Sequence, residues 1–232
     1  MISKTENKLK EMQEKLDLAT SYVSGMVEDV GTLLNGYDPK LAESIIGRDA
    51  SVNKLDSDIN KICVYLLALH EPKAQDLRLV IATLNIIGEL ESIADYCEGI
   101  AKEIVRNGED LYKVDFIKLP KLFKETSAMI KDSIKAFHDR DDRLALSIIE
   151  RDDRVDKIHK KILKKSVESL TDYSEMAPST VSLIFITRSL ERAADHAATI
   201  AEHAYYMATG EIIKNVAVRE VRDEGESSSS NS

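Results

Sequence analysis

The sequence predicts an all-α protein of six long helices, arranged as two tandem antiparallel three-helix bundles. The composition is one reason, because the 232 residues include only 9 glycines and 4 prolines and no tryptophan, whereas residues that favour helices are abundant. An internal duplication is the other reason: LESIAD at 90–95 recurs as LERAAD at 190–195, and LAESIIGRD at 41–49 recurs as LALSIIERD at 144–152. A repeat of this length indicates a duplicated domain rather than a solenoid, so we expect two bundles related by a pseudo-twofold axis.

Apolar residues at three- and four-residue spacing and turn residues between them define the helices of the first repeat. Asp38 is a good N-cap for the second helix, Pro39 suits its first turn, and Gly108 follows the third. The predicted helices cover about 3–34, 39–70 and 73–106, and the first bundle covers 1–108.

The second repeat shows the same pattern after a predicted linker at 109–117. The turn at 139–141 separates its first two helices, and Gly210 ends its last one. The predicted helices cover about 119–139, 142–173 and 178–209, within a second bundle at 118–210. The tail at 211–232 loses apolar periodicity and ends in SSSSNS, so we expect it to be frayed or disordered.

Charge and hydropathy exclude several classes of protein. The net charge of −9 and pI near 5.2 argue against a nucleic-acid binder and are compatible with cation binding. No run approaches the ~18–20 apolar residues of a membrane span, and the first ten residues are too polar for a signal peptide, so we expect a cytoplasmic protein. Cys63 and Cys97 lie on apolar helix faces and are expected to be reduced core thiols.

Acidic pairs at four-residue spacing recur in both repeats. Such residues lie above one another on a helix, and their small apolar neighbours make two stacked carboxylates costly unless a cation neutralises them. If adjacent helices pack antiparallel, each repeat gathers about four oxygen-bearing side chains. The candidate ligands are Asp49, Asn53, Glu91 and Asp95 in the first repeat and Asp152, Asp156, Glu191 and Asp195 in the second.

These clusters could be neutralised by protonation, by arginines such as Arg188 or Arg192, or by a metal. Oxygen ligands suit Mg²⁺, Ca²⁺, Mn²⁺ and ferric iron, and the absence of a Cys or multi-His group argues against a closed zinc site. Di-iron oxidases use Glu-x-x-His, which only Asp156 with His159 approaches. No catalytic triad or phosphate-binding glycine loop is evident, so we expect no enzyme. A carboxylate metallo-enzyme and a bundle with solvated acids are the remaining alternatives.

The segments LESIADYCEGIAK (90–102), LERAADHAATIAEHAYYMATGE (190–211) and EPKAQDLRLVIATLNI (71–86) resemble the PhoU family of phosphate-uptake regulators. This resemblance implies negative regulation of high-affinity phosphate uptake and of the phosphate-starvation response. It implies docking to the ATPase of a phosphate ABC transporter and to a phosphate-sensing histidine kinase, with membrane contact only through such partners. The alternative is an accessory partner of a phosphate permease that is not an ABC transporter.

The resemblance also implies multinuclear iron or zinc clusters on the eight candidate ligands, with manganese or magnesium as other possible ions, and it allows a homodimer. Two residues depart from the family pattern. Asn53 replaces an expected acid, and Ser92 stands where an arginine, kept at Arg192, is usual. We therefore expect the first-repeat site to bind metal more weakly.

Overall fold

The computed structural model describes residues 4–69, 72, 74–113, 118–172 and 174–213. The only regular secondary structure in this part of the chain is helical, with no strand, which confirms the predicted fold class. Its helices are α1 (Lys4–Leu33), α2 (Pro39–Leu69), α3 (Ala74–Asn107), α4 (Leu119–Asp139), α5 (Asp142–Asp172) and α6 (Ala177–Thr209), with 3₁₀ helices η1 (Gly108–Lys113) and η2 (Ser174–Met176). None of the described helices is long and apolar enough to cross a membrane.

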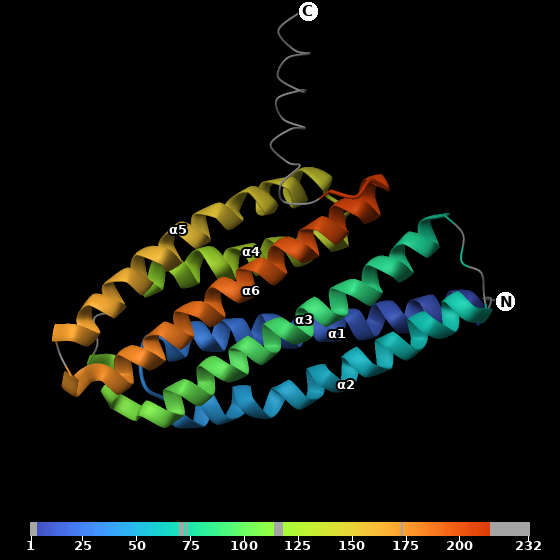
Figure 1. Cartoon of the computed structure of the whole chain (residues 1–232). Coiled ribbons are helices and arrows are strands. Elements are labelled where there is room, and N and C mark those ends of the chain that lie inside the picture. The colour runs from blue at the N-terminus through green and yellow to red at the C-terminus, as the bar shows by residue number, and fades with distance from the viewer. Residues whose placement is uncertain (1–3, 70–71, 73, 114–117, 173, 214–232) are drawn as a thin grey trace, which may run out of the picture.

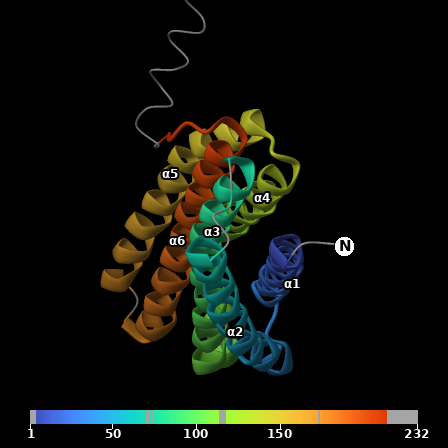
Figure 2. The same ribbon diagram turned by 90° about the vertical axis from the view of Figure 1, so that its right-hand side faces the viewer.

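Helices α3 and α6 lie side by side in the middle of the molecule and join the two bundles (Figure 1). Helix α2 packs on the outer side of α3, and α5 packs on the outer side of α6. Helices α1 and α4 cover one side of this four-helix layer, as the turned view shows (Figure 2). The other side of this layer is not covered by α1 or α4. It is formed by α2 and α3 in the first bundle and by α5 and α6 in the second.

Local capping explains where the helices begin and end. The backbone N–H groups of Lys40 and Leu41 donate to Asp38 Oδ1 over 3.0 and 3.1 Å, which confirms Asp38 as the N-cap of α2. Arg140 and Gly210 adopt left-handed φ values of 53° and 83° at the ends of α4 and α6. The helix boundaries agree with the predicted ones to within a few residues.

The first residues of the predicted linker form the 3₁₀ helix η1. The chain continues from α3 into η1, because Leu111 is buried and the Tyr112 hydroxyl donates to the Leu33 carbonyl over 2.5 Å. The rest of the linker, 114–117, lies outside the described residues, as do 70–71, 73 and 173 of the predicted helices. The predicted tail is described only at 211–213, where Ile213 is buried, and its residues 214–232 also lie outside.

The core confirms the duplication at the level of side chains. Arg48 pairs with Asp29 in the first repeat, and Arg151 pairs with Asp132 over 2.6 Å at the equivalent positions of the second. Both cysteines are buried free thiols, as predicted. Burial raises the pKa of Cys63 to about 11, so this thiol is protonated at neutral pH.

Candidate metal-binding carboxylate clusters

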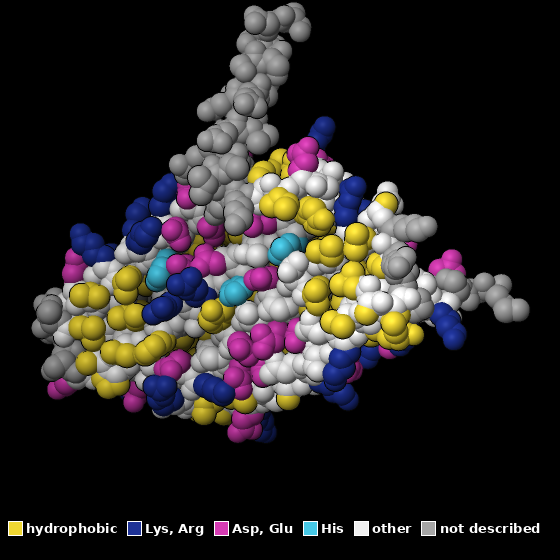
Figure 3. Space-filling view, turned by 45° about the vertical axis from the view of Figure 1, so that its right-hand side comes forward, with side chains coloured by type: hydrophobic (Ala, Val, Ile, Leu, Met, Phe, Trp, Pro, Cys, Tyr) yellow, Lys and Arg dark blue, Asp and Glu magenta, His cyan; other side chains and the backbone are white. Residues whose placement is uncertain are grey.

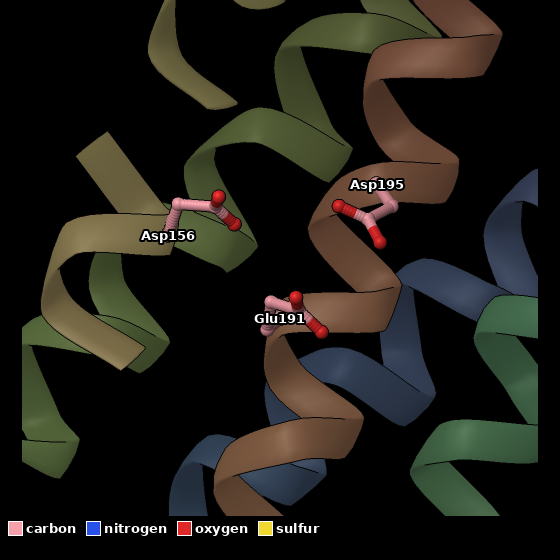
Figure 4. A group of neighbouring side chains, drawn as sticks. All are labelled: Asp156, Glu191 and Asp195. Carbon is pink, nitrogen blue, oxygen red and sulfur yellow. The ribbon is translucent and has the colours of Figure 1, made fainter. Parts of the chain in front are cut away.

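Three carboxylates of the second repeat converge between α5 and α6, and we call them the α5–α6 cluster: Asp156, Glu191 and Asp195. Each offers one oxygen, and these oxygens all lie within 4.8 Å of one another. Figure 4 shows Asp156 reaching from α5 toward the two acids of α6. The three side chains are partly buried, so the site is open to solvent on one side.

The local sequence explains this convergence. Glu191 and Asp195 lie one turn apart on α6, and the buried Leu190 and Ala194 beside them turn that face of the helix toward α5. Asp156 follows the buried Val155 on α5, so its carboxylate lies at the edge of the interface between α5 and α6.

Basic side chains surround the cluster without filling it. Arg192 Nη1 donates to Asp195 Oδ2 over 3.1 Å, and Lys160 Nζ donates to Asp156 Oδ2 over 3.1 Å. The arginine pairing considered from the sequence is therefore present for Arg192. Burial nevertheless raises the pKa of Asp195, and the charges of Glu191 and Asp156 raise it further, although Arg192 opposes this rise. Arg192 and Lys160 are well exposed, so both can turn away at little cost.

One nitrogen donor also lies near the α5–α6 cluster. His159 Nδ1 is 3.7 Å from Glu191 Oε1, and both side chains are largely buried. An imidazole beside carboxylates widens the set of ions that the site suits from hard cations to zinc and ferrous iron.

The first repeat holds a second group of acids, the α2–α3 cluster, formed by Asp49, Asp56, Glu91, Asp95 and Glu98. Burial raises the pKa of Asp49, and the charges of Asp95 and Glu98 raise it further. Burial also raises the pKa of Glu91, and the negative charges of Asp95, Asp56 and Asp49 raise it further. These carboxylates therefore repel one another in the absence of a cation.

Asp49 carries a polar atom that lacks a hydrogen-bond partner among the described residues. Its Oδ1 is shielded from solvent and accepts no hydrogen bond from the residues that the structure describes. Its Oδ2 accepts a hydrogen bond of 2.9 Å from the Asn53 amide, so these two candidate ligands are in contact. A buried carboxylate oxygen without a donor is the type of atom that a bound cation would satisfy.

The structure thus brings together most of the predicted ligands. Asp152 lies on α5 one turn before Asp156, with its Oδ1 buried like that of Asp49, its repeat equivalent. Asn53 and Asp95 are exposed. Sequence reasoning missed Glu98, although its three-residue spacing from Asp95 places both on one face of α3.

His196 follows Asp195 on α6, and one residue turns a helix by about 100°, so its side chain points away from that acid. It reaches α3 instead, where its Nδ1 lies 2.5 Å from Glu89 Oε2, and its charge opposes the rise in the Glu91 pKa. Acidic side chains form two groups on one face of the molecule, and histidines lie beside and between these groups (Figure 3). Glu89 had no signal in the sequence, because the contact joins the two repeats.

Fold and site together define a duplicated helical-bundle protein with one carboxylate cluster in each repeat. The PhoU domain family model matches residues 16–104 and 119–204, which include both clusters. The chain belongs to the PhoU family, and the resemblance seen in its motifs is confirmed.

Relatives cover most of the chain. It is 32% identical over 180 residues to the phosphate-specific transport system accessory protein PhoU homolog of Streptococcus pneumoniae, covering 78% of this chain and 83% of that protein. It is 30% identical over 198 residues to the phosphate-specific transport system accessory protein PhoU of Escherichia coli, covering 84% and 82%.

Solved structures show the same fold. The crystal structure of PhoU from Pseudomonas aeruginosa gives a TM-score of 0.83 at 28% identity, covering 88% of this chain and 99% of that one. The phosphate transport system regulatory protein PhoU from Streptococcus pneumoniae gives 0.82 at 28% identity, covering 91% and 100%.

Proposed function

We propose that this protein is a non-enzymatic adaptor that negatively regulates high-affinity phosphate uptake and the phosphate-starvation response. The observation that carries the proposal is the PhoU match across both repeats, together with relatives of about the same length that are named accessory proteins of phosphate-specific transport. A rigid bundle of long helices offers extended surfaces for docking and suits an adaptor.

The proposed mechanism is docking to two partners in the cytoplasm. When phosphate is plentiful, the protein binds the ATPase of the phosphate ABC transporter and the phosphate-sensing histidine kinase and favours the inactive state of each. A ligand or partner shifts such an equilibrium only by binding one state more tightly. The helical face that holds both carboxylate clusters is the proposed docking face, and a homodimer would present that face twice.

The clusters fit a multinuclear iron or zinc centre, or manganese or magnesium. The donors at hand are carboxylate oxygens that repel one another, a buried Asp49 oxygen without a donor among the described residues, and His159 beside Glu191. Asp156, Glu191 and Asp195 would hold metal in the second repeat, and Asp49, Glu91 and Asp95 in the first. A bound metal supplies positive charge, which would hold each pair of helices together and fix the proposed docking face.

Deletion of the gene tests the proposal. We expect a strain that lacks the protein to take up radiolabelled phosphate rapidly and to express a phosphate-starvation reporter in phosphate-rich medium, and the wild-type gene to restore repression. Unchanged phosphate uptake and unchanged reporter activity in the deletion strain would contradict the regulatory role.

A second deletion experiment distinguishes the ABC transporter from the alternative partner, a phosphate permease of another kind. In a strain that already lacks the ABC transporter, loss of this protein should leave phosphate uptake unchanged. A further change in uptake there would assign the protein to a permease of another kind. Phosphatase or oxygen-consumption activity of the metal-loaded protein that is lost in Glu191→Ala would contradict a non-enzymatic adaptor.

A further inference from the structure

A cleft lies between α1 of the first repeat and α4 of the second, and it shares no residue with the carboxylate clusters. Its lining residues lie at 27–35 and 119–127, and we call it the α1–α4 cleft. Its volume of about 480 Å³ is within the range of small-molecule sites. The two helices come close here because Gly31 has no side chain, and a Cβ atom there would lie 2.6 Å from the Phe123 ring.

Most of the cleft wall is apolar. The apolar side chains that line it are Val27, Leu34, Leu119, Pro120 and Phe123. Outside the cleft, Leu18 is the only large hydrophobic side chain of the described helices α1 and α4 that is exposed. The apolar surface therefore ends with the cleft, so it suits a small molecule better than the longer apolar face of a partner helix.

The neutral polar side chains of the cleft offer mainly hydrogen-bond acceptors. The hydroxyl groups of Thr32 and Ser127 donate to backbone carbonyls of their own helices over 3.4 and 3.2 Å. The Asn35 amide donates one of its protons to the Gly31 carbonyl over 2.8 Å. Both hydroxyl protons are therefore used within the helices, whereas the lone pairs of the hydroxyl oxygens and of the Asn35 side-chain oxygen are left to bind a donor.

Glu28 is the only charged side chain that lines the cleft. The salt bridges of α1 involve other side chains, so its carboxylate is unpaired among the described residues. Lys121 and Lys124 of α4 are exposed but do not line the cleft, and neither forms a salt bridge with Glu28. A broad basic partner would meet these lysines, whereas a small cation inside the cleft meets the carboxylate and the acceptors beside it.

The duplication provides an internal comparison. Ile134 is the equivalent of Gly31, and its side chain is partly buried against the core. Lys131 is the equivalent of Glu28 and carries the opposite charge. The repeated fold therefore does not require the cleft, because both the glycine that brings the helices together and the acid belong to one end of the α1–α4 pair alone.

We propose that the α1–α4 cleft binds a small organic amine with an aromatic or aliphatic body. The protonated amino group donates to the Glu28 carboxylate and to the neighbouring oxygens, and the body packs between α1 and α4 against the Phe123 ring. An anion of the same shape is disfavoured, because it meets a carboxylate and lone pairs. This proposal goes beyond the role in phosphate regulation and does not rest on it.

Titration of the full chain with 4-phenylbutylamine tests this proposal, with 4-phenylbutanol and 4-phenylbutyrate as neutral and anionic probes of similar shape. In a two-dimensional methyl NMR spectrum, the amine should shift the signals of Val27, Leu34 and Leu119, with a dissociation constant on the order of a millimolar for so small a ligand. The butyrate should bind roughly tenfold more weakly than the amine. Glu28→Gln should weaken binding of the amine roughly fivefold and leave that of the alcohol unchanged. Ser127→Leu adds bulk to the cleft wall and should weaken binding of both.

Glu43→Gln on α2 is the matched control, because Glu43 is exposed, lies outside the cleft and changes the net charge equally. This variant should bind the amine like the wild type, and circular dichroism should show equal helicity in every variant. Unshifted signals of the three methyl-bearing residues, equal binding of the butyrate, or an equal loss in Glu43→Gln would overturn the proposal. Binding of a basic leucine–lysine peptide at the same residues, without binding of the amine, would overturn it too and would assign the cleft to a partner helix.

Discussion

His196 on α6 and Glu89 on α3 form a contact of 2.5 Å between Nδ1 and Oε2 that joins the two repeats. Both side chains are about three-quarters buried. The His196 ring also lies against Tyr96, its repeat equivalent, with ring centroids 5.6 Å apart. Ser189 occupies the position equivalent to Glu89, so this polar contact occurs on one side of the pseudo-twofold axis only.

This contact should stabilise the interface between the bundles. In a double-mutant cycle of Glu89→Gln and His196→Phe, we expect a coupling free energy of about 1 kcal/mol from urea denaturation, because the bond is charge-assisted and partly shielded from water. The exposed pair Asp110 and Lys113 within η1 is the control and should show no measurable coupling. Equal coupling in both cycles would contradict a structural role for the Glu89–His196 pair.

The carboxylate clusters could be predicted from sequence periodicity, whereas the contact between Glu89 and His196 could not. Glu191 and Asp195 share a face because 3.6 residues make a turn, and the duplication assigns the same arrangement to Glu91 and Asp95. The approach of Asp156 follows from antiparallel packing of neighbours in the chain. Each step uses local geometry or a short connection, so it is visible in the sequence.

The contact between Glu89 and His196 depends on how one bundle is rotated against the other. That rotation is set by the fit of many side chains along α3 and α6, and no spacing in the sequence encodes it. The same limit applies to η1, because the burial of Leu111 and the Tyr112 hydrogen bond depend on where the end of α1 lies. Sequence therefore predicts the helices and the clusters better than the contacts between repeats.

Acids in the α2–α3 cluster should make the metal-free protein less stable as the pH rises. The pKa values of Asp49 and Glu91 are raised from 3.8 and 4.5. The folded state therefore binds these protons more tightly than the unfolded state does. Their stabilising contribution is fully present below the ordinary pKa values and is lost as the pH rises through the folded ones.

The double variant Asp49→Asn, Glu91→Gln should consequently be more stable than the wild type at neutral pH in the presence of a chelator. We expect a gain below about 1 kcal/mol, since both groups are partly open to solvent. Thermal unfolding from acidic to neutral pH gives the comparison. A variant that loses stability at neutral pH would show that the carboxylates are stabilised in their charged form.

Asn53 and Asp156 occupy equivalent positions in the two repeats. Giving each position the residue of the other repeat therefore tests both sets of candidate metal ligands. Asn53→Asp replaces an amide donor to Asp49 by a further carboxylate and should raise the affinity of the α2–α3 cluster for Mn²⁺. Asp156→Asn should lower that of the α5–α6 cluster. Calorimetric titration should show changes on the order of tenfold, the scale on which ligand surroundings tune metal affinity. The metal assignment fails if neither substitution alters Mn²⁺ binding.

Gly31 on α1 lies against Phe123 of α4, where a Cβ atom would come within 2.6 Å of the ring. Gly99 on α3 has no atom within 4 Å of such a Cβ and serves as the matched control. Gly99→Ala should stabilise the protein by about 0.5–1 kcal/mol, because alanine lowers the entropy of the unfolded helix segment. Gly31→Ala gains the same entropic stabilisation, but its methyl group displaces the Phe123 ring and weakens the packing of α1 on α4. We therefore expect the Gly31→Ala protein to be less stable than the Gly99→Ala protein by about 1 kcal/mol or more. Urea denaturation of both variants measures this difference, and equal stabilisation would mean that Phe123 moves away freely and that α1 and α4 are held by the rest of their bundles alone.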